Sequence, residues 1–198
     1  MKINIDPKAK ALIFDLDGTL SDSIPVHIAS WHTVCGEMGC TFDERIVAEM
    51  TGAATISFAE RIKNEHNLKI DPQEIVRRKQ SHFWENAHKV KPILSVIEVV
   101  KKYHKILPMA VGTGASRRSA ELQLETLQLK DYFDVIVTAD DVDKHKPEPD
   151  TFLKCARLMN IEPEDCVVFE DGELGMRAAR TAGMLLVDVR PYLEPGKE

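Results

Sequence analysis

The sequence is poor in aromatic residues, which make up 6% of it, and it has no long hydrophobic run. No apolar stretch approaches the roughly 20 residues of a membrane-spanning helix, and the segment MKINIDPKAKALIF lacks the long apolar core of a secretory signal peptide. The sequence therefore predicts a cytoplasmic protein that does not bind membranes. Cysteine is also scarce and forms no Cys-x-x-Cys pair, so we expect reduced and mostly buried thiols at Cys35, Cys40, Cys155 and Cys166.

Positive charge is in deficit as well. The 26 Lys and Arg residues are outnumbered by 32 Asp and Glu residues, which gives a net charge of −6. This balance disfavours general binding to nucleic acids or anionic membranes, so an anionic ligand would need a local positive site. Apolar residues are present in an ordinary proportion, 43% of 198 residues. The length suits one domain with a good core, or one domain with a small insertion.

Short apolar segments that are rich in Val and Ile alternate with amphipathic segments along much of the chain. The apolar segments do not alternate with polar residues, which is typical of strands buried on both faces. Strands that alternate with helices predict an α/β fold with a parallel sheet and helices on both of its faces. The expected strands are 10–15, 108–113, 133–140, 166–171 and 184–189, and the expected helices between them are 93–105, 116–129, 149–160 and 173–184.

One long interval interrupts this alternation. Between the first two strands, the sequence has almost no strand pattern and predicts four helices in succession, at 24–39, 42–50, 54–66 and 71–88. We therefore expect an α/β core formed by residues 1–21 and 90–198, with residues 22–89 inserted as a helical cap.

Polar residues follow the predicted strands at the point where each strand ends. In an open parallel sheet, ligands bind outside the carboxyl ends of the strands, so these residues are expected to meet at one edge. They are Asp15 and Asp17 after the first strand, Thr113 and Gly114 after the second, Lys146 in the loop after the third, and Glu170 and Asp171 at the fourth.

The chemistry of these residue types points to phosphoryl transfer. Carboxylates that lie close together recruit a cation, and a small set of oxygen ligands suits Mg²⁺. Thr113 precedes a helix N-terminus, where backbone N–H groups bind phosphate, and Lys146 supplies a fixed positive charge. An aspartate can attack phosphorus and form an aspartyl-phosphate. A second carboxylate two residues further on can protonate the leaving oxygen and then deprotonate water.

Four segments of the sequence resemble the four motifs of the haloacid dehalogenase superfamily of phosphotransferases. They are DLDGT at 15–19, Thr113, Lys146 in KPEPD, and FED at 169–171. The resemblance implies a Rossmann-like parallel sheet with an inserted four-helix cap. It also implies that Asp15 is nucleophile and metal ligand, and that Asp17 is the general acid and base and binds the metal through its backbone carbonyl.

The same resemblance implies roles for the other strand-end residues. Thr113 and Lys146 would hold the transferring phosphoryl group, with Gly114 in contact with the substrate. Asp171, together with Glu170, would complete the Mg²⁺ site.

The insert resembles the small helical cap of the β-phosphoglucomutase branch of this superfamily. His27 in HIASW resembles a His-x-x-x-Trp pattern on the first cap helix, and Lys79 resembles a cap lysine that meets the distal part of the substrate. In the mutase, a cap arginine clamps a second phosphate, and here Thr55 takes its place. The missing bidentate clamp favours a phosphatase. The stretches MAVGTG, HKPEPDTF and CVVFED resemble the fructose-1-phosphate phosphatases of this branch and imply small sugar phosphates as substrates.

Several alternatives stay open. A sugar phosphomutase would need a bisphosphate activator. A signalling receiver domain also combines an acidic pair, Thr and Lys on a parallel sheet, but its phospho-accepting Asp follows a middle strand and it has no helical insert. A phosphometabolite-binding protein without catalysis is a further possibility. For single residues, His27 could simply be packed or on the surface, Lys79 could belong to a basic helix face, and Thr113 could be an ordinary helix cap. We expect a monomer.

Overall fold

The apolar segments form one five-stranded sheet in the computed structural model, which describes residues 3–193. The spatial order is β5-β4-β1-β6-β7, and every neighbouring pair is parallel. The α/β class and the parallel sheet are therefore confirmed. The strands are shorter than predicted, most of all the one expected at 133–140, which spans three residues. Their bounds are β1 Ala11–Phe14, β4 Met109–Gly112, β5 Val135–Val137, β6 Cys166–Glu170 and β7 Leu185–Asp188.

The central strand, β1, is buried on both faces, which explains its unbroken apolar sequence. Its side chains alternate between two cores. Leu12 and Phe14 pack on one face against residues of α5 (Leu94–Tyr103) and α6 (Arg117–Thr126). Ile13 packs on the other face with residues of α7 (Asp150–Met159) and α8 (Glu173–Thr181). The sheet is thus covered by helices on both faces, as the alternating pattern predicts.

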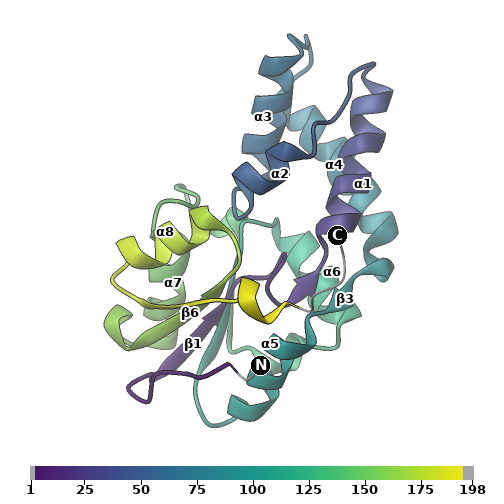
Figure 1. Ribbon diagram of the computed structural model, residues 1–198. Coiled ribbons are helices and arrows are strands. Elements are labelled where there is room, and N and C mark those ends of the chain that lie inside the picture. Colours follow the sequence, from purple (N-terminus) through teal and green to yellow (C-terminus); the bar gives the residue numbers. More distant parts are fainter. Residues whose placement is uncertain (1–2, 194–198) are drawn as a thin grey trace.

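The inserted segment forms a separate helical bundle above the sheet (Figure 1). Its helices are α1 Ile24–Glu37, α2 Arg45–Met50, α3 Thr55–Glu65 and α4 Pro72–Asn86. They enclose an apolar core of their own, which includes Trp31, Phe42, Ile62 and Ile75. Short 3₁₀ turns elsewhere span Ala87–Lys89, Lys130–Tyr132, Ala139–Asp141, Pro163–Asp165 and Arg190–Tyr192.

The two connections between core and bundle pair with each other. Strand β2 (Ser21–Asp22) lies antiparallel to β3 (Lys91–Pro92), with Ser21 opposite Pro92 and Asp22 opposite Lys91. Strands of two residues carry no periodicity, so the sequence pattern did not predict them. The pairing holds the entry and the exit of the insert side by side.

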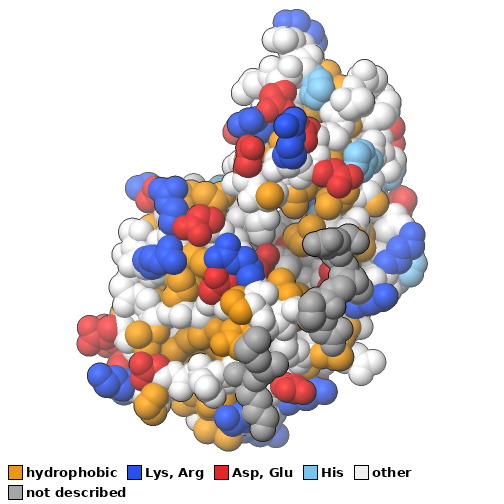
Figure 2. All heavy atoms as spheres, viewed as in Figure 1, with side chains coloured by type: hydrophobic (Ala, Val, Ile, Leu, Met, Phe, Trp, Pro, Cys, Tyr) orange, Lys and Arg blue, Asp and Glu red, His pale blue; other side chains and the backbone are white. Residues whose placement is uncertain are grey.

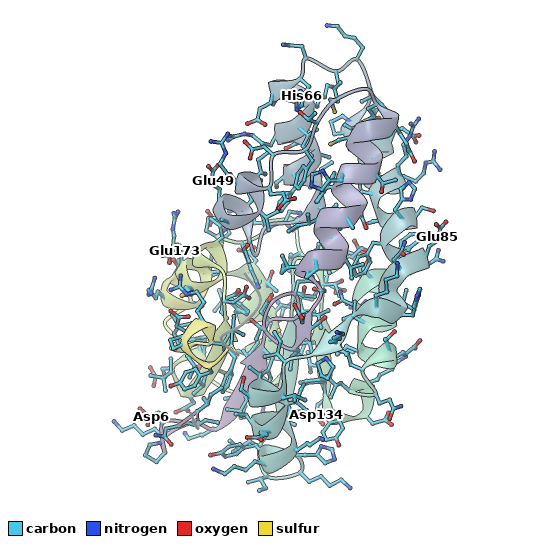
Figure 3. The ribbon with its side chains drawn as sticks, turned by 45° about the vertical axis from the view of Figure 1, so that its right-hand side comes forward. Asp6, Glu49, His66, Glu85, Asp134 and Glu173 are labelled. Atoms are coloured by element: carbon cyan, nitrogen blue, oxygen red, sulfur yellow. The ribbon has the colours of Figure 1, made fainter. Side chains whose placement is uncertain are left out.

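The carboxyl ends of the parallel strands face the bundle. Asp134, which directly precedes β5, lies in the lower part of Figure 3, far from His66 at the distal end of α3. The strands therefore run from that lower part toward the insert, and the residues that follow them lie between core and bundle. Within residues 3–193, no helix is both long and apolar enough to span a membrane.

Candidate active site

A buried lysine connects two acidic residues at the end of the sheet. Asp15 directly follows β1, and Glu170 is the last residue of the adjacent β6. Lys146 lies in the loop that precedes α7, and its Nζ donates to Asp15 Oδ1 at 2.6 Å and to Glu170 Oε2 at 2.7 Å. All three residues are at most 4% exposed. The bonds are thus charge-assisted and screened from water, which makes the group a rigid unit.

Asp171 completes an acidic cluster beside this unit. One carboxylate oxygen each from Asp15, Glu170 and Asp171 lies within 4.8 Å of the others. Thr19 Oγ1 donates to Asp171 Oδ1 at 2.8 Å, and this bond orients the carboxylate. Gly18 has φ +88°, and a Cβ there would lie 2.2 Å from Asp171 Oδ2. Glycine is needed at this turn for both its backbone conformation and the close approach of the carboxylate.

The carboxylates of the cluster are not equivalent. Glu170 Oε1 accepts hydrogen bonds from the backbone N–H groups of Asp171 and Gly172 at 3.2 and 2.9 Å, while its Oε2 is bonded to Lys146. Among the described residues, none donates a hydrogen bond to Oδ2 of Asp15 or Asp171. These two oxygens are free to bind a cation, and Glu170 mainly holds Lys146 in place.

Burial and the neighbouring carboxylates raise the pKa values of Asp15 and Asp171. Burial raises the pKa of Asp15 well above its usual range, and Glu170 raises it further against the opposing effect of Lys146. Burial and Glu170 also raise the pKa of Asp171 to about 7. Burial by itself would lower the pKa of Lys146, but Asp15 and Glu170 outweigh it and raise that pKa. Lys146 is therefore positively charged at neutral pH, and the excess negative charge disfavours ionisation of the carboxyls.

Asp17 points away from this cluster, toward the insert. Its Oδ1 accepts three hydrogen bonds, from Ser23 Oγ at 2.5 Å, His27 Nε2 at 2.8 Å and Gln123 Nε2 at 3.0 Å. Burial would raise the pKa of Asp17, but His27 and then the hydrogen bonds outweigh it and lower that pKa far below its usual range. Asp17 is an ionised carboxylate in this arrangement, and its side chain is not part of the acidic cluster.

His27 and Lys79 lie in line behind Asp17. The ring of His27, from α1, stacks on Phe83 of α4 with 4.1 Å between ring centroids. Its Nδ1 contacts Lys79 Nζ, which has to be the donor, so Nε2 carries the hydrogen that Asp17 accepts. Burial and the charge of Lys79 lower the pKa of His27, and burial lowers the pKa of Lys79 to about 8. The structure brings both predicted cap residues to the site.

Thr113 and Gly114 follow β4 and face the loop between α2 and α3. Thr113 Oγ1 accepts a hydrogen bond from the backbone N–H of Ala115 at 3.0 Å, so its hydroxyl hydrogen can still be donated. A Cβ on Gly114 would lie 2.8 Å from the backbone oxygen of Gly52. Gly114 thus allows the close contact between the core and the insert, besides lining the site.

A cleft connects these residues. It is lined by the core residues Asp15, Asp17 and Thr113 and by insert residues that include Thr55 and Lys79. Figure 2 shows side chains of both charges on the surface of the core and of the insert. Exposed ion pairs include Arg61–Glu49 at 3.8 Å and Arg180–Glu173 at 3.4 Å. Exposed pairs of this kind are screened and largely cancel each other. The positive charge that meets an anionic ligand therefore has to come from the buried lysines.

All the strand-end residues predicted from sequence lie at one edge of the sheet, but some polar partners were missed. Ser23 and Gln123 contact Asp17, and Ser21 in turn donates to Gln123 Oε1 at 2.7 Å. The two serines follow the DLDGT segment closely, which is a weak signal that could have found them. Gln123 lies inside an ordinary amphipathic helix and had no such signal.

A parallel sheet with an aspartate, a buried lysine and further carboxylates at one edge, below an inserted helical bundle, points to a hydrolase. The sequence agrees with this class, because the family model described as haloacid dehalogenase-like hydrolase matches residues 12–189. The chain belongs to the haloacid dehalogenase-like hydrolases and is an enzyme of that family.

The relatives of the chain include phosphatases and a mutase. The fructose-1-phosphate phosphatase YqaB of Escherichia coli (strain K12) is 42% identical over 179 residues, which cover 90% of this chain and 95% of YqaB. The β-phosphoglucomutase of Bacillus subtilis (strain 168) is 30% identical over 187 residues, or 91% and 83% of the two chains. The crystal structure of β-phosphoglucomutase from Clostridium difficile superposes with a TM-score of 0.81 at 22% identity, over 91% of this chain and 84% of that one. This structural likeness shows the shared fold.

Proposed function

We propose that the protein is a Mg²⁺-dependent phosphatase that hydrolyses small sugar phosphates through an aspartyl-phosphate. The observation that carries this proposal is the buried Lys146 bonded to Asp15 and Glu170, next to Asp171, because Asp15 in turn lines the cleft. A lysine that neutralises a buried aspartate beside further carboxylates suits a site where a nucleophile, a cation and a phosphate have to coexist.

The donor set of the cluster suits Mg²⁺. It contains hard carboxylate oxygens, and two of them, on Asp15 and Asp171, are free of hydrogen bonds from the described residues. Asp15, Asp171 and the backbone carbonyl of Asp17 would hold the ion, with Glu170 beside them. A bound Mg²⁺ would supply the positive charge that stabilises the phosphate oxygens and keeps the carboxyls of the cluster ionised.

The residues of the chain then divide the reaction between them. An oxygen of Asp15 attacks phosphorus, and the bond from phosphorus to the sugar oxygen breaks. Asp17 is ionised in this structure, so it has to take up a proton before this step, and it then gives that proton to the sugar oxygen. Asp17, now a carboxylate, takes a proton from water as the water oxygen attacks the aspartyl-phosphate. This second step releases phosphate and restores Asp15, with the proton back on Asp17. Lys146 and Thr113 hold the transferring group in both steps.

The lining of the cleft favours hydrolysis over mutase chemistry. The basic side chains that line it are those of His27 and Lys79, and the position expected for a phosphate-clamping arginine is Thr55. A hydroxyl cannot replace the bidentate pairing of a guanidinium with a second phosphate. We therefore propose substrates with one phosphate, with Lys79 toward their distal part, and fructose 1-phosphate as the first candidate because of the similarity to YqaB.

Other predictions from the sequence extend this proposal. The division into a core of residues 1–21 and 90–198 and a cap of residues 22–89 agrees with a lid that excludes water in the first step and admits it in the second. The cytoplasmic location and the monomeric state stay predictions as well.

The proposal is tested by phosphate release from a panel of sugar phosphates, with Mg²⁺ and with a chelator. We expect release that requires Mg²⁺, is fastest with fructose 1-phosphate and is absent in Asp15→Asn. Release from many sugar phosphates at similar rates would keep the chemistry and reject the preferred substrate. No release unless a sugar bisphosphate is added, accompanied by isomerised sugar phosphate, would identify a mutase. No turnover under any condition would reject the enzymatic proposal.

A further inference from the structure

The buried side chain of Gln123 joins Asp17, the carboxylate proposed to transfer protons, to β2, one of the two strands that connect core and insert. Gln123 lies on α6, one of the core helices, and is 0% exposed. Its Nε2 donates to Asp17 Oδ1 at 3.0 Å, and its Oε1 accepts from Ser21 Oγ at 2.7 Å. Both ends of the amide are therefore engaged within the protein.

The surroundings of this amide determine its orientation. If the amide were flipped, its oxygen would face the carboxylate of Asp17, and two acceptors without a hydrogen between them would be buried together. In the observed orientation the amide donates to Asp17, and the hydroxyl of Ser21 donates to the amide oxygen. Ser21 is also 0% exposed, so water does not replace either bond.

The arrangement leaves one carboxylate oxygen of Asp17 for the reaction. Oδ1 receives the bonds from Ser23, His27 and Gln123. None of the described residues donates a hydrogen bond to Oδ2, and Asp17 lines the cleft together with Asp15. Anchoring Oδ1 at three points thus fixes the direction in which Oδ2 meets a ligand.

Gln123 also links this direction to the strands that connect core and insert. Ser21 belongs to β2 and lies opposite Pro92 of β3, the strand by which the chain returns from the insert. A change in the position of β2 moves the Ser21 hydroxyl, and with it the amide of Gln123. Ser23 and His27 belong to the insert side of this connection, so Gln123 is the partner of Asp17 that comes from the core.

We propose that Gln123 is a positioning residue that holds Asp17 for proton transfer and, through Ser21, ties its orientation to the strands that connect core and cap. This inference rests on the proposed function, in which Asp17 protonates the departing sugar oxygen. It concerns geometry, because the amide neither gains nor loses a proton in either step.

The test compares leaving groups that differ in their need for a proton. A sugar alkoxide leaves with a proton from Asp17, whereas the acetate of acetyl phosphate is a weak base and leaves without one. The parameter to measure is kcat/KM, because it reports the steps up to phosphoryl transfer to Asp15 and not the later attack of water. The variants are Gln123→Met, which keeps the length of the side chain without its hydrogen bonds, and Ser21→Ala. The matched control is Gln73→Met, at an exposed position of α4.

We expect Gln123→Met to lower kcat/KM about 10- to 100-fold for the best sugar phosphate of the panel and less than about 3-fold for acetyl phosphate, since acid catalysis contributes factors of about 10²–10⁴. Ser21→Ala should lower the ratio of kcat/KM for the sugar phosphate to kcat/KM for acetyl phosphate in the same direction but by a smaller factor. Gln73→Met should leave this ratio unchanged. The ratio of the two values does not depend on the fraction of folded enzyme, so partial misfolding of a variant does not imitate the effect.

Each other outcome has a distinct meaning. An equal loss with both substrates in Gln123→Met would assign Gln123 to general packing and overturn the inference, and so would unchanged kinetics. A selective loss in Gln123→Met with an unaffected Ser21→Ala would overturn the link to β2. Failure of the wild-type protein to hydrolyse either substrate would reject the proposed function itself.

Discussion

Replacement of Lys146 by methionine should destabilise the fold by a predictable amount. Lys146 is bonded to Asp15 and Glu170, and the three side chains are 0–3% exposed. Methionine keeps most of the apolar stem, which lies next to Phe152 with Nζ 4.6 Å from the ring centroid, so the change mainly removes the charge. Loss of one partner of a buried ion pair costs about 3–5 kcal/mol. At about 2–4 °C per kcal/mol for a chain of this size, we expect a decrease in Tm of about 6–20 °C.

The loss should also depend on pH with a defined sign. Without Lys146, the pKa of Asp15 in the folded protein rises further above its unfolded value of about 4. A carboxyl with a raised folded pKa binds its proton more tightly in the folded state, so the folded state loses stability as pH rises through neutrality. The loss of stability of Lys146→Met relative to the wild type should therefore be larger at pH 8 than at pH 5.

The assay is thermal denaturation followed by circular dichroism, with a chelator present so that no divalent cation replaces the missing charge. Lys144→Met is the control, because Lys144 lies two residues away and is exposed. Its Tm should stay close to that of the wild type. Addition of Mg²⁺ should recover part of the loss in Lys146→Met. The electrostatic reasoning is refuted if Lys146→Met melts within about 2 °C of the wild type in chelator at pH 8.

Three further predictions follow from the same cluster. Asp15→Asn should abolish phosphate release and keep or raise Tm, since it removes one of several clustered negative charges; near-normal turnover would disprove its role as nucleophile. Mg²⁺ affinity, measured by thermal shift, should rise with pH through the region of pH 7, because Asp171, with its pKa of about 7, binds either a proton or the ion. A flat profile would exclude Asp171 as a ligand. Gly18→Ala should lose about 1–3 kcal/mol of stability and most of the rise in Tm on addition of Mg²⁺, because the φ of +88° and the 2.2 Å approach of Asp171 leave no room for a Cβ. Gly36→Ala is the control and should change neither property, because a Cβ there meets nothing within 4 Å.

Much of the fold could be predicted because its elements are marked by local pattern. Strand β1 is buried on both faces, and the unbroken apolar run at 10–15 reflects this directly. The helices of the insert were found within a few residues of their observed bounds, with α2 the least accurate, starting at Arg45 instead of 42. The pair β2 and β3 was missed because two residues are too few to show any period.

The gathering of Asp15, Thr113, Lys146 and Glu170 also followed from the sequence. Parallel strands present their carboxyl ends at one edge of the sheet, so residues that follow different strands are brought together by topology alone. Gly18, which directly follows Asp17, also indicated that the chain turns after the first strand. This logic places residues in one region, but it does not assign bonds to atoms.

The sequence by itself determined the fold class, the edge of the sheet where the site lies and the residue types available there. The tertiary structure decided which oxygen of Glu170 binds Lys146, that Asp17 faces the insert, and that Lys79 reaches His27 from 52 residues away and Gln123 reaches Asp17 from 106. Periodicity depends on neighbours along the chain, whereas these contacts depend on how the insert and α6 pack against the sheet. The partners of a buried polar group are therefore known only once the surfaces that bury it have met.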